Sequence, residues 1–158
     1  MADALPGRCT CGAVAYRLTD TPIITHACHC TWCQRETGSA FALNGVIETE
    51  RVELTSGAPV PIELPTPSGG GQRVMRCPSC QVALWSHYLG GSASLAYVRL
   101  GTLDDTAGIA PDVHIFTSTK QPWLALPEDG TPVFEEFYRP SAVLPPERYA
   151  RFKAAIGR

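Results

Sequence analysis

The chain has 158 residues, a length that suits one compact domain with a hydrophobic core of its own. Hydrophobic residues make up 44% of the chain and charged residues 18%, which argues against wholesale disorder. A formal charge of −2 without a basic stripe gives no electrostatic support for a nucleic-acid or membrane-surface partner.

The N-terminal residues lack a basic segment followed by an apolar run, so they do not resemble a secretory signal. No apolar stretch approaches the roughly 18 residues that would indicate a membrane span. We therefore expect a soluble, cytoplasmic protein with a single domain over residues 1–158. In that reducing compartment, cysteines are better explained as metal ligands or catalytic thiols than as a disulfide framework.

Glycine and proline, 14 of each, divide the chain into pieces of strand length, and this pattern predicts a mainly β fold. The first piece, residues 13–18, places Val14, Tyr16 and Leu18 on one face, as in a half-buried strand. Further short strands are expected, in chain order, at residues 23–28, 40–47, 52–55, 72–77, 82–86, 94–100, 114–116 and 133–138.

A short helix is expected at residues 32–37, directly after the central cysteines. Thr31 followed by Gln34 matches a capping box, and Gly38 suits the end of such a helix.

Two further segments are expected outside the strands. Residues 59–71 are so rich in proline and glycine that we predict an exposed connection ending in a flexible loop, not a central strand. A C-terminal helix is expected at residues 146–156, where Pro146 suits the first turn and three apolar residues share one face. We expect that face to pack on the sheet.

The seven cysteines fall into three closely spaced groups, and this grouping is the strongest chemical signal in the sequence. Zinc bound to thiolates prefers a tetrahedron with Zn–S near ~2.3 Å, so the sulfurs must lie about 3.7 to 3.8 Å apart. A C-x-C pair on an extended segment and a C-x2-C turn can each bring two sulfurs to one ion. The groups are Cys9 and Cys11, then Cys28, Cys30 and Cys33, then Cys77 and Cys80.

Seven thiolates divide most economically into four and three, which predicts two zinc ions. The first and third groups would complete one tetrahedral structural site that clamps the N-terminal strand to the middle of the chain. The central group, Cys28, Cys30 and Cys33, supplies only three thiolates and leaves the fourth position for water or a substrate. Cys33 would lie in the first turn of the short helix, where the helix dipole favours a thiolate.

Several alternatives stay open at this point. One or two of the cysteines can be buried residues that bind no metal. The central group can hold a structural ion completed by a histidine, for which His26, His29, His87 and His114 are available. The ring of His29 should point away from the neighbouring sulfurs, which favours a packing role. An iron–sulfur cluster fits this spacing less well than zinc.

At these cysteines the sequence resembles the glutathione-dependent formaldehyde-activating family, also called the family of centromere protein V. The resemblance is carried by residues 7–14, residues 28–35 with 38–41, residues 76–80, and a Lys-x-Pro-Trp element at residues 120–123. It implies a tent-like fold of short antiparallel strands stabilised by two zinc ions. It also implies that the central three cysteines hold a catalytic ion and the other four a structural one.

The activity for which that family is named joins formaldehyde and glutathione into S-hydroxymethylglutathione, a carbon–sulfur lyase reaction in its reverse sense. Three anionic sulfurs lower the Lewis acidity of a zinc ion, which favours delivery of a thiol over activation of water. We therefore expect a thiol and a small aldehyde as partners, with Ser39, Lys120 and Trp123 as candidate substrate-binding residues. A zinc-stabilised binding module without catalysis is the alternative, because a fold does not determine a substrate.

Overall fold

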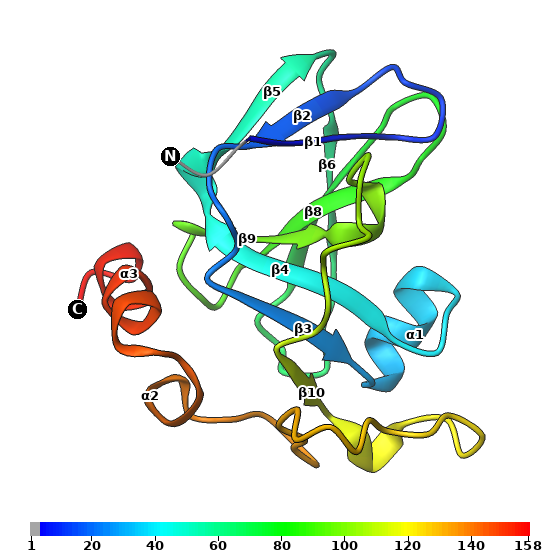
Figure 1. The fold of residues 1–158 in the computed structure, drawn as a ribbon. Helices are drawn as coiled ribbons and strands as arrows, with labels where there is room; N and C mark the ends of the chain where they lie inside the picture. The colour runs from blue at the N-terminus through cyan, green and yellow to red at the C-terminus, as the bar shows by residue number, and fades with distance from the viewer. Residues whose placement is uncertain (1–3) are drawn as a thin grey trace.

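The computed structural model describes residues 4–158, which form two β-sheets and a small number of short helices (Figure 1). The smaller sheet has the antiparallel order β1 (Leu5–Arg8), β2 (Ala15–Leu18) and β5 (Val52–Ser56). The larger sheet has the order β10 (Val113–Ile115), β3 (Ile24–Cys28), β4 (Ala42–Glu48), β9 (Leu95–Arg99), β8 (Ala83–Tyr88), β7 (Gln72–Arg76) and β6 (Val60–Leu64). All pairs are antiparallel except β10 with β3, which run parallel. The predicted mainly β class is confirmed.

The helices connect strands or follow the last one. Three of them are α-helical, namely α1 (Thr31–Thr37), α2 (Pro140–Val143) and α3 (Pro146–Ala155). Single turns of 3-10 helix occur at η1 (Thr49–Arg51), η2 (Leu100–Thr102) and η3 (Thr117–Thr119). Among residues 4–158, none of the helices combines the length and the apolar character that a membrane span needs.

Helix α1 lies where the sequence predicts it, but its start differs by one residue. The N-cap is Cys30, whose sulfur accepts a hydrogen bond from the backbone N–H of Cys33 at 3.3 Å. The side chain of Gln34 does not close a capping box with Thr31, because its oxygen accepts a hydrogen bond from the amide of Gln121 at 2.6 Å while its Nε2 donates to the carbonyl of His29 at 2.7 Å. The helix ends at Gly38, which adopts a left-handed conformation with φ of 64°. A cysteine therefore has two roles here, as a cap and as a candidate ligand.

Two strands form where the sequence predicts none. Residues 60–64 of the expected connection pair with β7 as edge strand β6, and an edge position tolerates the missing N–H of Pro61. The connection predicted for residues 59–71 was therefore wrong in its first half. Strand β1 contains Gly7, where a Cβ atom would lie 2.7 Å from Cζ of Tyr16, so this apparent breaker is required by close packing.

The strand predicted for residues 133–138 is not formed. Val133 makes only an isolated parallel bridge with His114. Phe116 has a left-handed backbone with φ of 54°, and this turn leads the chain out of β10 into η3. The ladder cannot continue past such a residue, so residues 134–136 bond to this turn irregularly.

The larger sheet has a hydrophobic cluster on each face, as the alternation of its strands requires. Ile47 of β4 and Val98 of β9 face the smaller sheet, where the ring of Tyr16 packs on Trp85 with centroids 5.6 Å apart. Val46 of β4 faces the opposite cluster, which includes the C-terminal segment. The apolar face of α3, formed by Tyr149, Phe152 and Ile156, packs against this second cluster, as predicted.

Helix α3 is also held by an ion pair with β4. The guanidinium of Arg151 contacts both carboxylate oxygens of Glu48, at 2.9 and 2.7 Å. Burial, the largest single effect, would raise the pKa of Glu48, but the hydrogen bonds from Arg151, a backbone hydrogen bond and the charges of Arg151 and Arg51 together hold the pKa below its ordinary value of 4.5. The pKa of such a carboxyl group is lower in the folded protein than in the unfolded chain. Its contribution to stability is therefore complete at pH values above the unfolded-state pKa and is lost as the pH falls through the folded-state pKa.

We expect Arg151→Met to lower the free energy of unfolding by about 1 to 3 kcal/mol near pH ~7, because a largely buried carboxylate loses its two shortest ion-pair contacts and keeps only Arg51 at 3.4 Å. The deficit relative to the unmodified protein should shrink as the pH falls below about 4.5 and Glu48 is protonated. Urea denaturation at several pH values measures this. Arg148→Met is the matched control, because the pair of Arg148 with Asp112 is exposed and should contribute under about 1 kcal/mol.

Candidate metal centres

The four outer cysteines form a group between the two sheets. Cys9 and Cys11 lie in the turn from β1 to β2, and Cys77 and Cys80 lie in the turn from β7 to β8. Their four sulfurs all lie within 4.8 Å of one another. Cys11 Sγ is 3.6 Å from that of Cys9 and 3.7 Å from that of Cys77, close to the edge of a thiolate tetrahedron around zinc. The group can therefore hold one metal ion that joins both sheets.

Matching backbone turns present the two halves of this group. The N–H of Cys9 donates to the carbonyl of Val14, and that of Cys77 donates to the carbonyl of Val82, both at 3.0 Å. The C-x-C pair was expected on an extended segment, but it lies in a turn, and β2 begins only at Ala15. The N–H of Val14 also donates to the sulfur of Cys9 at 3.3 Å, which favours a thiolate.

The three central cysteines form the second group. Cys28 is the last residue of β3, Cys30 caps α1, and Cys33 lies in the first turn of that helix. Their sulfurs lie within 4.8 Å of one another, and those of Cys28 and Cys30 are 3.6 Å apart. Among residues 4–158, this group contains no histidine and no carboxylate. The structure thus gives the histidine-completed alternative no support.

The three thiols of the central group differ in acidity, and Cys30 is the one whose pKa is lowered, whereas the pKa of Cys28 and that of Cys33 are raised. Hydrogen bonds from the thiols of Cys28 and Cys33 lower the pKa of Cys30 to about 2. The hydrogen bond with Cys30, then the hydrogen bond with Cys33 and then burial raise the pKa of Cys28. Burial and then the charges of Cys33 and Cys28 raise the pKa of Tyr88, so this phenol stays protonated beside the sulfurs. A divalent cation bound to the three sulfurs would favour loss of the thiol protons and would balance the negative charge that results.

The histidines take other roles than metal ligands of this group. The Nε2 atom of His26 lies 2.6 Å from the hydroxyl of Tyr138. The Nε2 atom of His29 lies 2.9 Å from Nδ1 of His114, with the two rings stacked, and burial lowers the pKa of His29 to about 4. The packing role expected for His29 agrees with these contacts. His87 bonds to the carbonyl of Leu95 at 3.0 Å.

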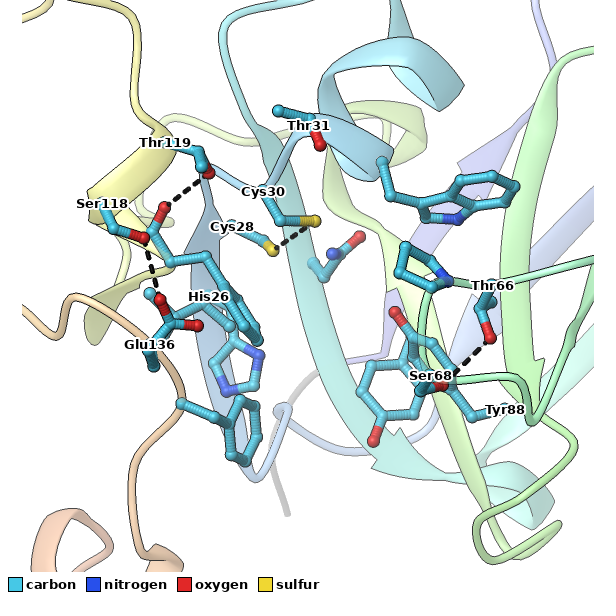
Figure 2. A pocket seen from close by; sticks show the side chains of 17 residues that line it. His26, Cys28, Cys30, Thr31, Thr66, Ser68, Tyr88, Ser118, Thr119 and Glu136 are labelled. Atoms are coloured by element: carbon cyan, nitrogen blue, oxygen red, sulfur yellow. Dashed lines mark hydrogen bonds between the residues drawn. The ribbon is translucent and has the colours of Figure 1, made fainter.

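A cavity of roughly 440 Å³ opens from the central group, which is an ordinary size for a small-molecule site (Figure 2). Figure 2 shows the sulfurs of Cys28 and Cys30 between two walls of side chains. One wall carries His26, Ser118 and Glu136, and the other carries Thr66, Ser68 and Tyr88. The ring of Phe137 adjoins those of His26 and Phe116, whereas Tyr97 packs on Tyr88 and Trp32 bonds to Gln72 beside Tyr88. Cys28 and Cys30 therefore line an accessible cavity in which aromatic rings alternate with hydroxyl-bearing side chains.

The three predicted substrate-binding residues do not line this cavity. Ser39 is exposed just after α1, and Trp123 is 72% exposed. The ammonium of Lys120 donates to the carbonyl of Gln121 at 3.3 Å and is half-buried. Sequence reasoning missed lining residues such as Tyr88 and Glu136, and it named His26 only as a possible fourth ligand. His26 lines the cavity on the face of Cys28 because the two residues are two positions apart on β3. That periodicity could have identified it.

The comparisons with known proteins add a family and a fold. The family model described as "Glutathione-dependent formaldehyde-activating enzyme" matches residues 4–119. A Rhodobacter sphaeroides protein of known crystal structure is 16% identical, with a TM-score of 0.50 over 82% of this chain and 99% of the other. This likeness shows a shared fold alone. No curated protein matches the chain significantly.

The family match spans well over half of the chain and includes all seven cysteines. It ends before residues 120–158, which contribute Glu136 and Phe137 to the cavity. The chain belongs to the family of glutathione-dependent formaldehyde-activating enzymes.

Proposed function

We propose that this chain is a zinc-dependent enzyme that adds a thiol to formaldehyde or to another small aldehyde. The observation that carries the proposal is that Cys28 and Cys30 line a cavity, with no fourth protein ligand grouped with the central cysteines among residues 4–158. A thiolate site with a free coordination position is the arrangement of a catalytic zinc, whereas a structural zinc has four protein ligands. The family match supports the same chemistry.

In this proposal Cys9, Cys11, Cys77 and Cys80 hold a structural zinc ion, and the central cysteines hold a catalytic one. Both groups fit zinc, because their closest sulfurs are 3.6 to 3.7 Å apart. When bound at the central group, zinc supplies the positive charge that lets a substrate thiol lose its proton near neutral pH.

The residues of the chain would orient the reactants and exclude water. Trp32 and Tyr88 line one wall and Phe137 the other, which leaves a narrow aromatic space beside the sulfurs. Burial lowers the pKa of His26 to about 4, so this lining residue is neutral at neutral pH. In the reaction the sulfur of the thiolate bonds to the carbonyl carbon, the carbon–oxygen π bond breaks, and the oxygen takes a proton to become a hydroxyl. Proximity of the two reactants supplies most of the acceleration.

Metal analysis and adduct formation test the proposal. Protein purified without chelators should contain about two zinc ions per chain, as the two cysteine groups require. With formaldehyde and a panel of thiols that includes glutathione and 2-mercaptoethanol, NMR should show the S-hydroxymethyl adduct forming faster than in buffer. Glu53→Gln, on an exposed strand far from the cysteines in sequence, is the control for nonspecific effects. A rate equal to the buffer rate with every thiol would refute catalysis and leave a zinc-stabilised binding module.

A further inference from the structure

The lining of the cavity contains an acidic side chain but no lysine or arginine among the described residues. Of the described residues that line it, Glu136 carries the one carboxylate. His26 also lines the cavity, with its Nε2 atom 2.6 Å from the hydroxyl of Tyr138. A substrate that enters this cavity therefore meets aromatic rings, an imidazole, hydroxyl groups and one carboxylate.

The central cysteines add negative charge where Cys28 and Cys30 line the cavity. Three thiolates and one divalent ion would sum to −1, and a bound substrate thiolate would bring the total to −2. At the effective dielectric of about 20 that applies near a protein surface, such charge still acts over several ångströms. It opposes further negative charge on the substrate and favours positive charge.

Three cationic side chains outside the lining have partners of their own. Arg99 is buried and donates to the side-chain oxygen of the lining residue Asn44, so its charge offsets part of the negative charge of the central group without offering a free guanidinium to a substrate. Lys120 donates to the carbonyl of Gln121 and also lies off the lining. Arg76 pairs with Glu36. These cations do not provide the carboxylate-binding groups that a dicarboxylate thiol would need.

Glu136 lies in a setting that suits an ammonium group. Its Oε1 atom accepts a hydrogen bond from the hydroxyl of Ser118 at 3.0 Å, which holds the carboxylate on the wall (Figure 2). The rings of Phe116 and Phe137 lie on the same wall, 6.2 Å apart between centroids, and aromatic faces attract cations. Glu136 and Phe137 follow the last residue of the family match, so this part of the wall is not covered by that match.

We propose that the cavity selects small aminothiols, with a positive charge close to the thiol, over anionic thiols such as glutathione. This inference rests on the proposed function, which places the substrate thiol at the central cysteines, and it identifies the substrate as an aminothiol. The expected order of affinity is cysteamine, then neutral 2-mercaptoethanol, then 3-mercaptopropionate and glutathione.

The test measures thiol binding to the zinc-loaded protein in the absence of aldehyde, by NMR titration of each of the four thiols. Because the thiols differ in their intrinsic acidity, the decisive quantity is the change in their relative affinities on mutation. Glu136→Gln should reduce the preference for cysteamine over 3-mercaptopropionate by about 2- to 5-fold, the range of a solvent-accessible charge pair. Glu135→Gln is the matched control, because this exposed neighbour does not line the cavity and should leave the preference unchanged.

The outcomes separate this inference from the proposed function. Tighter binding of glutathione than of cysteamine, or an unchanged preference in Glu136→Gln, would overturn the aminothiol assignment even if the adduct forms. If cysteamine is preferred and Glu136→Gln reduces that preference, the assignment stands even if no thiol reacts with formaldehyde. In that case it is the proposed catalysis that fails.

Discussion

Replacing Cys77 with serine is expected to unfold the protein at room temperature. Cys77 is fully buried and belongs to the group that joins the turn between β1 and β2 to the turn between β7 and β8. Structural zinc contributes about 10 to 16 kcal/mol in small zinc domains, which is comparable to the roughly 5 to 15 kcal/mol of net stability of a whole domain. A serine oxygen is a poor replacement for a thiolate, and the buried hydroxyl would lack a partner.

Circular dichroism and metal analysis would measure this loss. We expect Cys77→Ser to lose its cooperative thermal transition, with zinc content falling below two ions per chain. Ser79→Ala is the matched control, because Ser79 is an exposed residue of the same turn and should keep both ions and the transition. A Cys77→Ser protein that melts at the same temperature as the unmodified chain would contradict a structural role for the outer group.

Replacing Cys30 with serine is expected to abolish catalysis while leaving most of the fold intact. The sulfur of Cys30 both belongs to the central group and caps α1 through the N–H of Cys33. Serine is among the best N-cap residues, so the helix should keep its cap while the group loses a thiolate. Without the ion, adduct formation should fall by at least about 100-fold, equivalent to about 2.7 kcal/mol of transition-state stabilisation.

Three measurements on one set of variants decide this prediction. Cys30→Ser should lose about one zinc ion per chain, retain a cooperative thermal transition and lose the acceleration of adduct formation. Cys30→Ala should be less stable than Cys30→Ser by about 1 kcal/mol, because alanine cannot cap the helix. If Cys30→Ser unfolds as completely as Cys77→Ser, the central group is structural and the proposed open site is wrong.

Local patterns in the sequence predict the features that depend on local geometry. The spacing of the cysteines indicates which sulfurs can meet, and the structure brings them together in the predicted groups of four and three. The alternation of Tyr16 and Leu18 predicts β2, and Gly38 predicts the end of α1. In each case the physical cause acts within a few residues of chain.

Features that depend on distant partners were missed. Proline and glycine argue against β1 and β6, but Gly7 is needed for contact with Tyr16, and Pro61 lies at a sheet edge. The cavity combines the loop after β6 with residues of β8, β9 and the segment after β10, so no single stretch of sequence reveals its lining. The left-handed turn at Phe116, which prevents a strand at residues 133–138, likewise has no clear sequence signature.

The wide separation of the outer cysteines along the chain also matters while the protein is being synthesised. Cys11 and Cys77, whose sulfurs lie 3.7 Å apart, are 66 positions apart. A growing polypeptide therefore exposes five thiols before Cys77 is synthesised. Cys9 and Cys11, together with two of the three central cysteines, could then bind one ion in a non-native arrangement. Delaying metal delivery until translation is complete should raise the yield of correctly assembled protein.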